Sequence, residues 1–320
     1  MPDTSQILLL ALAMDALIGD PAPLYARMPH PVALIGQAVD RLDRRFNRQT
    51  AGQAARYAAG IVGCILLVIA SLALGWLLHA LLRRVPGGWI GEALLISIFL
   101  AQNSLYRHVE EVARDLERNG LATGRAAVAR IVGRDPESLD EAGVSRAALE
   151  SLAENFSDGV TAPLFWALLL GLPGILAYKA VNTADSMIGH RTPHYRAFGW
   201  AAARLDDLLN LVPARFAALA IVVAAFLLPG ANAAAAFHAV MRDAAKHRSP
   251  NAGWPEASMA GALGLALAGP RQYEGQLVDD HWMHAKGRTT ASPVDIRRGL
   301  KLYVIACTVQ AGAIAALAAF

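Results

Sequence analysis

The chain has 320 residues, of which 55% are hydrophobic and only 17% are charged, and its net charge is +3. Soluble domains carry about 25% charged residues, so this composition argues against an ordinary solvated protein and favours a membrane protein. The basic residues stand beside apolar segments without interleaved aromatic residues, which argues against nucleic-acid binding. Cys64 and Cys307 both lie within apolar segments and give neither a disulfide framework nor a metal-ligand spacing.

The first apolar segment, residues 7–18, is too short to cross a bilayer. No basic residue precedes it, Asp15 lies inside it and no small-residue cleavage site follows, so it does not resemble a signal peptide. We expect it to be retained as an interfacial or protein-buried helix. Further along, His30 stands between Pro29 and Pro31, where we expect a structural turn, with a ligand contact as the alternative.

Membrane-spanning helices are expected near residues 58–82, 89–105, 211–228 and 302–320. The segment 58–82 has no charged residue and, at 1.5 Å per residue, exceeds the roughly 30 Å thickness of a hydrocarbon core. By the positive-inside rule the flank before it is cytoplasmic, because it carries Arg41, Arg44, Arg45, Arg48 and Arg56. The sequence leaves open the side of the basic segment 230–301, since a full crossing by 211–228 would place it outside.

The long polar segment 106–159 contains an amphipathic helix over residues 107–117 and a second helix over 123–132. Strand patterns are nearly absent from the chain. We therefore predict an all-α fold, a polytopic integral membrane helical protein with broken or re-entrant helices and polar cytoplasmic loops. Residues 1–320 are expected to form a single membrane-embedded domain.

Residues 160–181 are apolar but are interrupted by Pro163 and by the Gly-Leu-Pro-Gly sequence at 171–174. Proline between glycines breaks a helix, and each half is then too short to cross. We favour a re-entrant or protein-buried hairpin, which places the polar residues before and after it on the same membrane face. A single crossing is the alternative and places them on opposite faces.

Polar residues crowd both edges of this broken segment. They lie at 150–159 (Glu-Ser-Leu-Ala-Glu-Asn-Phe-Ser-Asp-Gly) and at 182–191 (Asn-Thr-Ala-Asp-Ser-Met-Ile-Gly-His-Arg), and continue to 198–207. Ionisable groups at or near a bilayer are costly, so their presence indicates a functional site.

A third polar motif, residues 242–256, places Lys246, His247 and Arg248 before a proline-rich turn. This arrangement fits an anion cradle; a basic flank attracted to anionic lipid is the alternative. The chain contains no P-loop, no dinucleotide-binding glycine motif, no zinc-protease helix and no nucleophile elbow.

Together these motifs resemble the adenosylcobinamide-phosphate synthase family of cobalamin biosynthesis, whose members are integral membrane proteins. The resemblance covers nearly the whole chain, through residues 15–21, 29–32, 154–159, 180–189, 198–207 and 246–255. It implies ATP-dependent formation of an amide bond between aminopropanol phosphate, or aminopropanol, and a propionate carboxylate of adenosylcobyric acid. ATP must activate the carboxylate because oxide is a poor leaving group, and Mg²⁺ neutralises phosphate charge.

The resemblance also assigns roles to the polar residues. The candidates for catalysis are Asp158, Asp185, Asp206, Asp207 and Glu154. The candidates for binding substrate or phosphate are Asn155, Ser157, Asn182, Ser186, Arg204, Lys246, His247, Arg248 and Asn251. Asp158 and Asp185 are the candidate Mg²⁺ ligands. Alternatively, one or two of the aspartates form structural pairs with Arg191, Arg196 or Arg204.

The expected location is the inner (cytoplasmic) membrane, with several passes. The expected partners are the corrinoid substrate, aminopropanol phosphate, the lipid bilayer and other membrane-associated enzymes of cobalamin assembly, and no nucleic acid. Two other classes remain open. A polytopic transporter also places polar residues beside broken helices, although no inverted repeat is visible here. A membrane regulatory or sensor protein of the same superfamily would be expected to lose the motif residues that this chain keeps.

Overall fold

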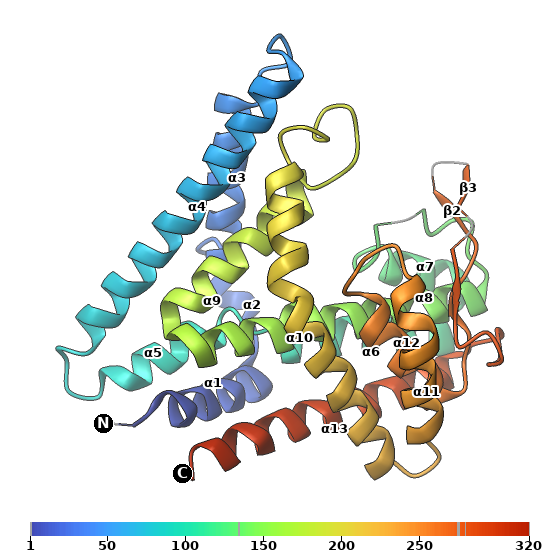
Figure 1. Cartoon of the computed structure of the whole chain (residues 1–320). Coiled ribbons are helices and arrows are strands. Elements are labelled where there is room, and N and C mark those ends of the chain that lie inside the picture. The colour runs from blue at the N-terminus through green and yellow to red at the C-terminus, as the bar shows by residue number, and fades with distance from the viewer. Residues whose placement is uncertain (1, 134, 274–275, 279, 320) are drawn as a thin grey trace. The chain divides into compact units, whose positions relative to one another are not determined.

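The computed structural model describes residues 2–133, 135–273, 276–278 and 280–319, and most of them are helical (Figure 1). The helices are α1 (Thr4–Ile18), α2 (Ala22–Tyr25), α3 (Pro31–Phe46), α4 (Gln53–Leu82), α5 (Gly88–Ser97), α6 (Gln102–Asn119), α7 (Leu121–Val128), α8 (Glu141–Phe156), the π-helix η1 (Ser157–Thr161), α9 (Ala162–Ile188), α10 (Trp200–Leu227), α11 (Ala233–Asp243), the 3₁₀-helix η2 (Ala244–Lys246), α12 (Gly253–Leu263) and α13 (Pro293–Leu317).

The strands in the described part of the chain are short and lie between α12 and α13. They are β1 (Leu267–Ala268), β2 (Arg271–Tyr273), β3 (Gln276–Val278) and β4 (Trp282–Met283). β1 pairs with β4 and β2 with β3, in both cases antiparallel. The predicted all-α, polytopic membrane fold is confirmed.

The contacts of the chain group into two compact units. Unit 1 comprises residues 2–101, 162–210 and 317–319, and unit 2 comprises residues 102–161 and 211–316. We predicted that residues 1–320 form a single membrane-embedded domain, and this stays a prediction.

Four helical segments among the described residues are long and apolar enough to cross a membrane. They are Gln53–Leu82, Glu141–Ile188, Trp200–Leu227 and Pro293–Leu317. The segments expected near 58–82 and 211–228 fall almost wholly within two of these, and 302–320 overlaps the last.

The segment 89–105 does not form one continuous helix, in contrast to the expected span. α5 ends at Ser97, whose hydroxyl donates to the carbonyl of Leu94 at 2.8 Å, and α6 begins only at Gln102. The change of unit between residues 101 and 102 falls at the same place. With 10 residues, α5 is too short to cross a hydrocarbon core.

Unit 1 is built on close helix packing around α4. α9 and α3 both pack along α4, and α1 packs on α5 (Figure 1). Two glycines of α4 allow this approach, because a Cβ at Gly60 would lie 2.0 Å from the carbonyl oxygen of Phe198, and one at Gly75 would lie 2.5 Å from Cα of Pro173. His30 has the structural role expected of it, since its Nδ1 accepts from the backbone N–H of Val32 at 3.2 Å and caps α3.

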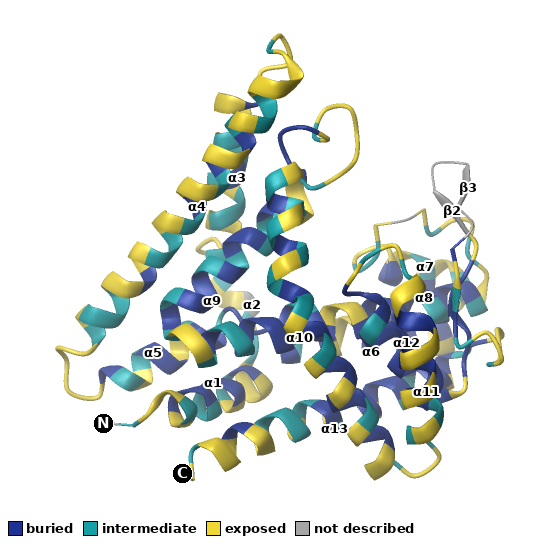
Figure 2. Ribbon diagram, in the orientation of Figure 1, coloured by how far each residue is buried: buried dark blue, intermediate teal, exposed yellow. Residues whose placement is uncertain are grey.

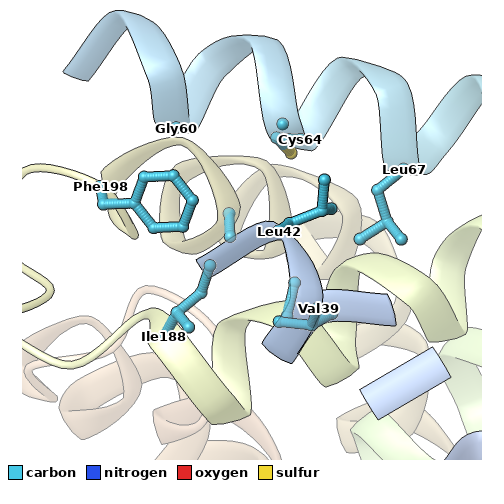
Figure 3. Close-up of a pocket in the computed structure, with 10 residues that line it drawn as sticks. Val39, Leu42, Gly60, Cys64, Leu67, Ile188 and Phe198 are labelled. Atoms are coloured by element: carbon cyan, nitrogen blue, oxygen red, sulfur yellow. The ribbon is translucent and has the colours of Figure 1, made fainter. Parts of the chain in front are cut away.

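A small apolar cavity remains where α3, α4 and the end of α9 meet. Val39, Leu42, Gly60, Cys64 and Phe198 are among the residues that line it, as Figure 3 shows. Because the lining is almost entirely apolar, the cavity offers no polar partners to a water molecule. It is a packing feature of unit 1.

The predicted break in the apolar segment 160–181 is present in α9. Gly171 has φ 63° and ψ −149°, which is not helical, and Pro173 follows without a backbone N–H. The halves of α9 on either side run in different directions (Figure 1). Whether the membrane is crossed or re-entered here stays a prediction.

The core of unit 2 is formed by α6, α7, α8, the second half of α10, α11, α12 and α13. The predicted amphipathic helix is confirmed as α6, which buries Leu105, Val109, Val112 and Leu116 on one face. The second predicted helix is the shorter α7. Figure 2 shows α8 and α12 largely buried, whereas α4 of unit 1 exposes much of its apolar surface, as a lipid-facing helix does.

Candidate functional site

A buried polar network joins α9 to α10 within unit 1. Asn182 Nδ2 donates to Oδ1 of Asp206 at 3.3 Å, and Asn210 Nδ2 donates to Oδ2 of Asp206 at 3.0 Å. Tyr178 OH donates to Oδ1 of Asn210 at 2.9 Å. The two residues on each helix are four positions apart and therefore share a face. Both carboxylate oxygens of Asp206 thus accept from neutral amides while the side chain is buried.

Asp185 stands at the edge of this network. It is half-buried and interacts electrostatically with Asp206. The neighbouring turn is shaped around it, because a Cβ at Gly189 would lie 1.9 Å from its Oδ1. The glycine of the second motif therefore leaves room for the carboxylate that the motif carries.

The other candidates of this motif make local contacts. Asp207 accepts from Nη1 of Arg204 at 3.0 Å, an exposed pair that contributes little to stability. A structural pair of this kind with Arg204 was the alternative to a catalytic role for one or two of the aspartates. Ser186 Oγ donates to the carbonyl of Asn182 in its own helix at 2.9 Å.

The first polar motif lies in unit 2, where α8 passes into the π-helical turn η1. π-helical turns inside helices are frequent at functional sites. Asp158 lies half-buried in this turn, and Ser157 Oγ is buried without a hydrogen-bond partner among the described residues. Glu154 is exposed, and Asn155 Nδ2 donates to the carbonyl of Ser151 at 2.9 Å.

Each basic residue expected in the anion cradle faces a buried acid. Lys246 Nζ lies 3.5 Å from Oδ1 of Asp243, and His247 Nε2 lies 3.7 Å from Oε1 of Glu256. Arg248 Nε donates to Oδ1 of Asp280 at 2.8 Å. The motif therefore carries its own compensating negative charge. Lys246 and Arg248 still expose about half of their side chains, at 48% and 57%.

Asp243 is the centre of this cluster. Arg242 donates to both of its carboxylate oxygens, at 2.9 and 2.6 Å, and the backbone N–H of His284 donates to Oδ2 at 2.9 Å. His281 Nε2 lies 3.4 Å from Oδ1. Burial by itself would raise the pKa of Asp243, but these hydrogen bonds outweigh it and lower the pKa to about 2. The carboxylate is therefore ionised at neutral pH.

The turn that follows the cluster has a defined conformation. Ser249 Oγ accepts from the backbone N–H groups of Asn251 and Ala252, at 3.2 and 3.1 Å. Asn251 Oδ1 accepts from Nη1 of Arg215 at 3.1 Å, and the same guanidinium lies 4.2 Å from the ring centroid of Trp254. Asn251 is thus held by α10 and faces inward.

Sequence reasoning missed the acids that hold the third motif. Asp243 could have been found, because it precedes Lys246 by one helical turn. Glu256 is the last residue of the motif, but its spacing from His247 is not that of one helical turn, and Asp280 lies far along the chain from Arg248. Glu150, the first residue of the first polar motif, was given no role from the sequence; it is buried and its Oε1 accepts from the backbone N–H of Ala268 at 2.9 Å.

The candidate Mg²⁺ ligands belong to different units, Asp158 to unit 2 and Asp185 to unit 1. Within the described ranges, no group of three or more His, Cys, Asp and Glu side chains is placed to hold a metal ion. The carboxylates that the structure does bring together are those of Asp185 and Asp206. The expectation that Asp158 and Asp185 are Mg²⁺ ligands stays a prediction.

Comparison with known proteins places these motifs in a family. The model of the family described as CobD/Cbib protein matches residues 8–303. The chain belongs to the CobD/Cbib family. A relative from Sinorhizobium sp, described as cobalamin biosynthesis protein CobD, is 53% identical over 98% of this chain and 97% of its own length.

Two further relatives carry the same description. The Rhizobium meliloti (strain 1021) protein is 51% identical over 98% of this chain and 96% of its own length. The Rhodobacter capsulatus protein is 45% identical over 93% of this chain and 92% of its own length. No solved structure matches the chain. The family assignment made from the motifs is confirmed.

Proposed function

We propose that this protein is an enzyme of cobalamin biosynthesis that forms an amide bond. It joins aminopropanol phosphate to a propionate carboxylate of adenosylcobyric acid and gives adenosylcobinamide phosphate; with aminopropanol as the amine, the same reaction would give adenosylcobinamide. The observation that carries the proposal is similarity along the whole chain to proteins described as cobalamin biosynthesis protein CobD, 53% and 51% identical. The polar motifs that chemistry of this kind requires are present in the chain.

The reaction needs ATP because a carboxylate does not lose oxide to an amine. A carboxylate oxygen attacks the γ-phosphorus of ATP, the bond to ADP breaks, and an acyl phosphate forms. The amine nitrogen then attacks the acyl carbon, the C–O bond breaks, and inorganic phosphate leaves with the former carboxylate oxygen. The amine must lose a proton before it attacks, and Asp158 in the π-helical turn is the base that we assign.

Mg²⁺ would neutralise the charge of the ATP phosphates. It is usually held by one or two carboxylates together with substrate phosphates. Asp185 and Asp206 fit this requirement, because they are two interacting carboxylates in one polar network. Asn182 and Asn210 hold Asp206 by both of its oxygens and so fix its orientation.

Phosphate binding falls to the third motif. Lys246 and Arg248 are half-exposed, and each is oriented by a buried acid. Charge-assisted hydrogen bonds to phosphate are short and strong when the donors are held in place. The acids Asp243 and Asp280 are therefore positioning residues for the cations, and the exposed parts of the two cationic side chains bind the anion.

The proposal is tested with the purified full-length protein in lipid nanodiscs. Adenosylcobyric acid, aminopropanol phosphate, ATP and Mg²⁺ should give a corrinoid product whose mass equals that of an amide, with one ADP formed per product. Omission of either ATP or the amine should abolish formation of the amide product. Unchanged corrinoid with folded protein would contradict the proposal, and ATP-independent passage of corrinoid into proteoliposomes would favour a transporter.

The proposed location is the cytoplasmic membrane, because ATP is available on its inner face. The arginine-rich flank before α4 is expected on the same side.

A further inference from the structure

A groove runs between α3 and α4 in unit 1, with a volume of about 550 Å³. Its floor is apolar and includes Leu42 from α3 with Leu66 and Ala70 from α4. Arg41 and Arg45, one turn apart on α3, line the same groove. An apolar groove bordered by two cations fits a ligand that is apolar in one part and negatively charged in another.

The two arginines of the groove are not neutralised by the protein. Both are exposed, and neither forms an ion pair with an acid among the described residues. Arg45 lies over the ring of Phe46, with 6.0 Å from Cζ to the ring centroid. Arg44 on the same helix, in contrast, pairs with Asp40 at 3.0 Å and does not line the groove.

The apolar floor of the groove lies within the part of α4 that a bilayer would cover. Exposed apolar side chains on α4 extend from Ile61 to Leu81, a rise of about 30 Å, which matches a hydrocarbon core. Leu66 and Ala70 lie in the first half of this stretch, nearer the turn at residues 47–52 that joins α3 to α4. Arginine stems at this depth lie along apolar surface while their guanidinium groups reach the headgroup level.

We propose that this groove binds an anionic glycerophospholipid. An acyl chain packs on Leu42, Leu66 and Ala70, and the headgroup phosphate lies between Arg41 and Arg45. A zwitterionic lipid is disfavoured, since its cationic headgroup would add positive charge beside the two arginines. A second copy of this chain is disfavoured as well, because a two-fold contact through the groove would bring the arginines of both copies together.

The test is native mass spectrometry of the purified full-length protein in detergent, with equal amounts of phosphatidylglycerol and phosphatidylcholine. The wild type should retain phosphatidylglycerol several-fold more than phosphatidylcholine. Arg41→Gln/Arg45→Gln should abolish this preference. Ala70→Phe, which fills the groove and keeps both arginines, should lower the bound amount of both lipids.

Matched controls separate the groove from the general charge and bulk of the surface. Arg44→Gln/Arg48→Gln removes the same charge from the same flank, and Ala58→Phe adds the same ring at an exposed position of α4 outside the groove. Both should bind lipid as the wild type does. Equal retention of the two lipids by the wild type, or an equal loss in the controls, would overturn the proposal. So would a protein dimer that is lost with Arg41→Gln/Arg45→Gln.

Discussion

Asn182 on α9 donates from Nδ2 to Oδ1 of Asp206 on α10 across 3.3 Å. Asn210 occupies the second oxygen of the same carboxylate. None of the ion pairs among the described residues includes Asp206, so this buried acid is balanced by neutral amides alone. Burying a carboxyl group without a cationic partner is costly to stability, and the cost is explained if the group serves the reaction.

The acids of the first two motifs are expected to be essential for product formation. Asp158→Asn, Asp185→Asn and Asp206→Asn should each lower turnover by at least about a hundredfold, the usual loss when a preorganised polar group is removed from a reaction. Insertion and helix content should be unchanged, because asparagine is nearly isosteric. Turnover in nanodiscs with added Mg²⁺ measures the effect.

The exposed Glu137 offers a matched control, since Glu137→Gln makes the same chemical change outside the motifs. Its turnover should equal that of the wild type. Near-normal turnover in Asp158→Asn and Asp185→Asn would remove both residues from the site.

Lys246 is expected to act in phosphate binding. Lys246→Ala should raise the KM for aminopropanol phosphate or for ATP several-fold more than the KM for the corrinoid, because it removes a charged donor. Stability should change little, since Arg242 and the backbone of His284 still hold Asp243. Lys246→Arg should restore part of the affinity. If only the corrinoid KM rose, the phosphate assignment would be wrong.

Asp243 predicts a pH dependence of stability. Its pKa is lowered from 3.8 to about 2 in the folded protein, which corresponds to roughly 2 kcal/mol of stability at neutral pH. A lowered carboxyl pKa stabilises the folded state above the unfolded pKa, so the contribution should be complete above about pH 4 and lost as the pH falls towards 2. Unfolding of the wild type and of Asp243→Asn, followed by circular dichroism in detergent, measures it.

The difference in free energy of unfolding between the wild type and Asp243→Asn should be largest at pH 5 to 7 and should become smaller as the pH falls towards 2. A gap that stays constant from neutral pH down to about pH 2 would contradict the role given to the ionised carboxylate.

The polar motifs on the two sides of α9 are expected to face one compartment if they serve one reaction. Thiol labelling needs one exposed position before α9 and one after it. Ser151 is unsuitable because it is buried and its Oγ donates to the carbonyl of Ile131, whereas Glu137 and His190 are exposed. In a cysteine-free background, Glu137→Cys and His190→Cys should both react with an impermeant thiol reagent in inverted vesicles but not in intact cells.

Exposed positions at the two ends of α4 calibrate this labelling. Thr50→Cys, in the arginine-rich flank, should label from the cytoplasmic side, and Val85→Cys from the other. Labelling of Glu137→Cys and His190→Cys from opposite sides would mean a single crossing by α9.

Features that depend on the local pattern of residues were predicted correctly from the sequence. The period of apolar residues identified α6, and Gly171 with Pro173 located the break in α9. The end of α5 at Ser97 was missed, because an apolar stretch without glycine or proline there gives no stop signal.

Contacts between distant segments were beyond sequence reasoning. The pairing of Arg248 with Asp280 and of His247 with Glu256 depends on how the chain returns on itself, which no local spacing encodes. The π-helical turn at Ser157 likewise has no recognised sequence pattern. The motif residues could thus be named in advance, whereas the acids that orient them could not.

The proposed chemistry is tested most directly by following the oxygen of the substrate carboxylate. Adenosylcobyric acid labelled with ¹⁸O in that carboxylate is turned over by the purified protein with aminopropanol phosphate, ATP and Mg²⁺, and the products are analysed by mass spectrometry. ATP-dependent amide formation through an acyl phosphate predicts one ¹⁸O in inorganic phosphate for each amide formed, with the other retained in the amide. Absence of the amide, or amide formed with no ¹⁸O in phosphate, would contradict the account.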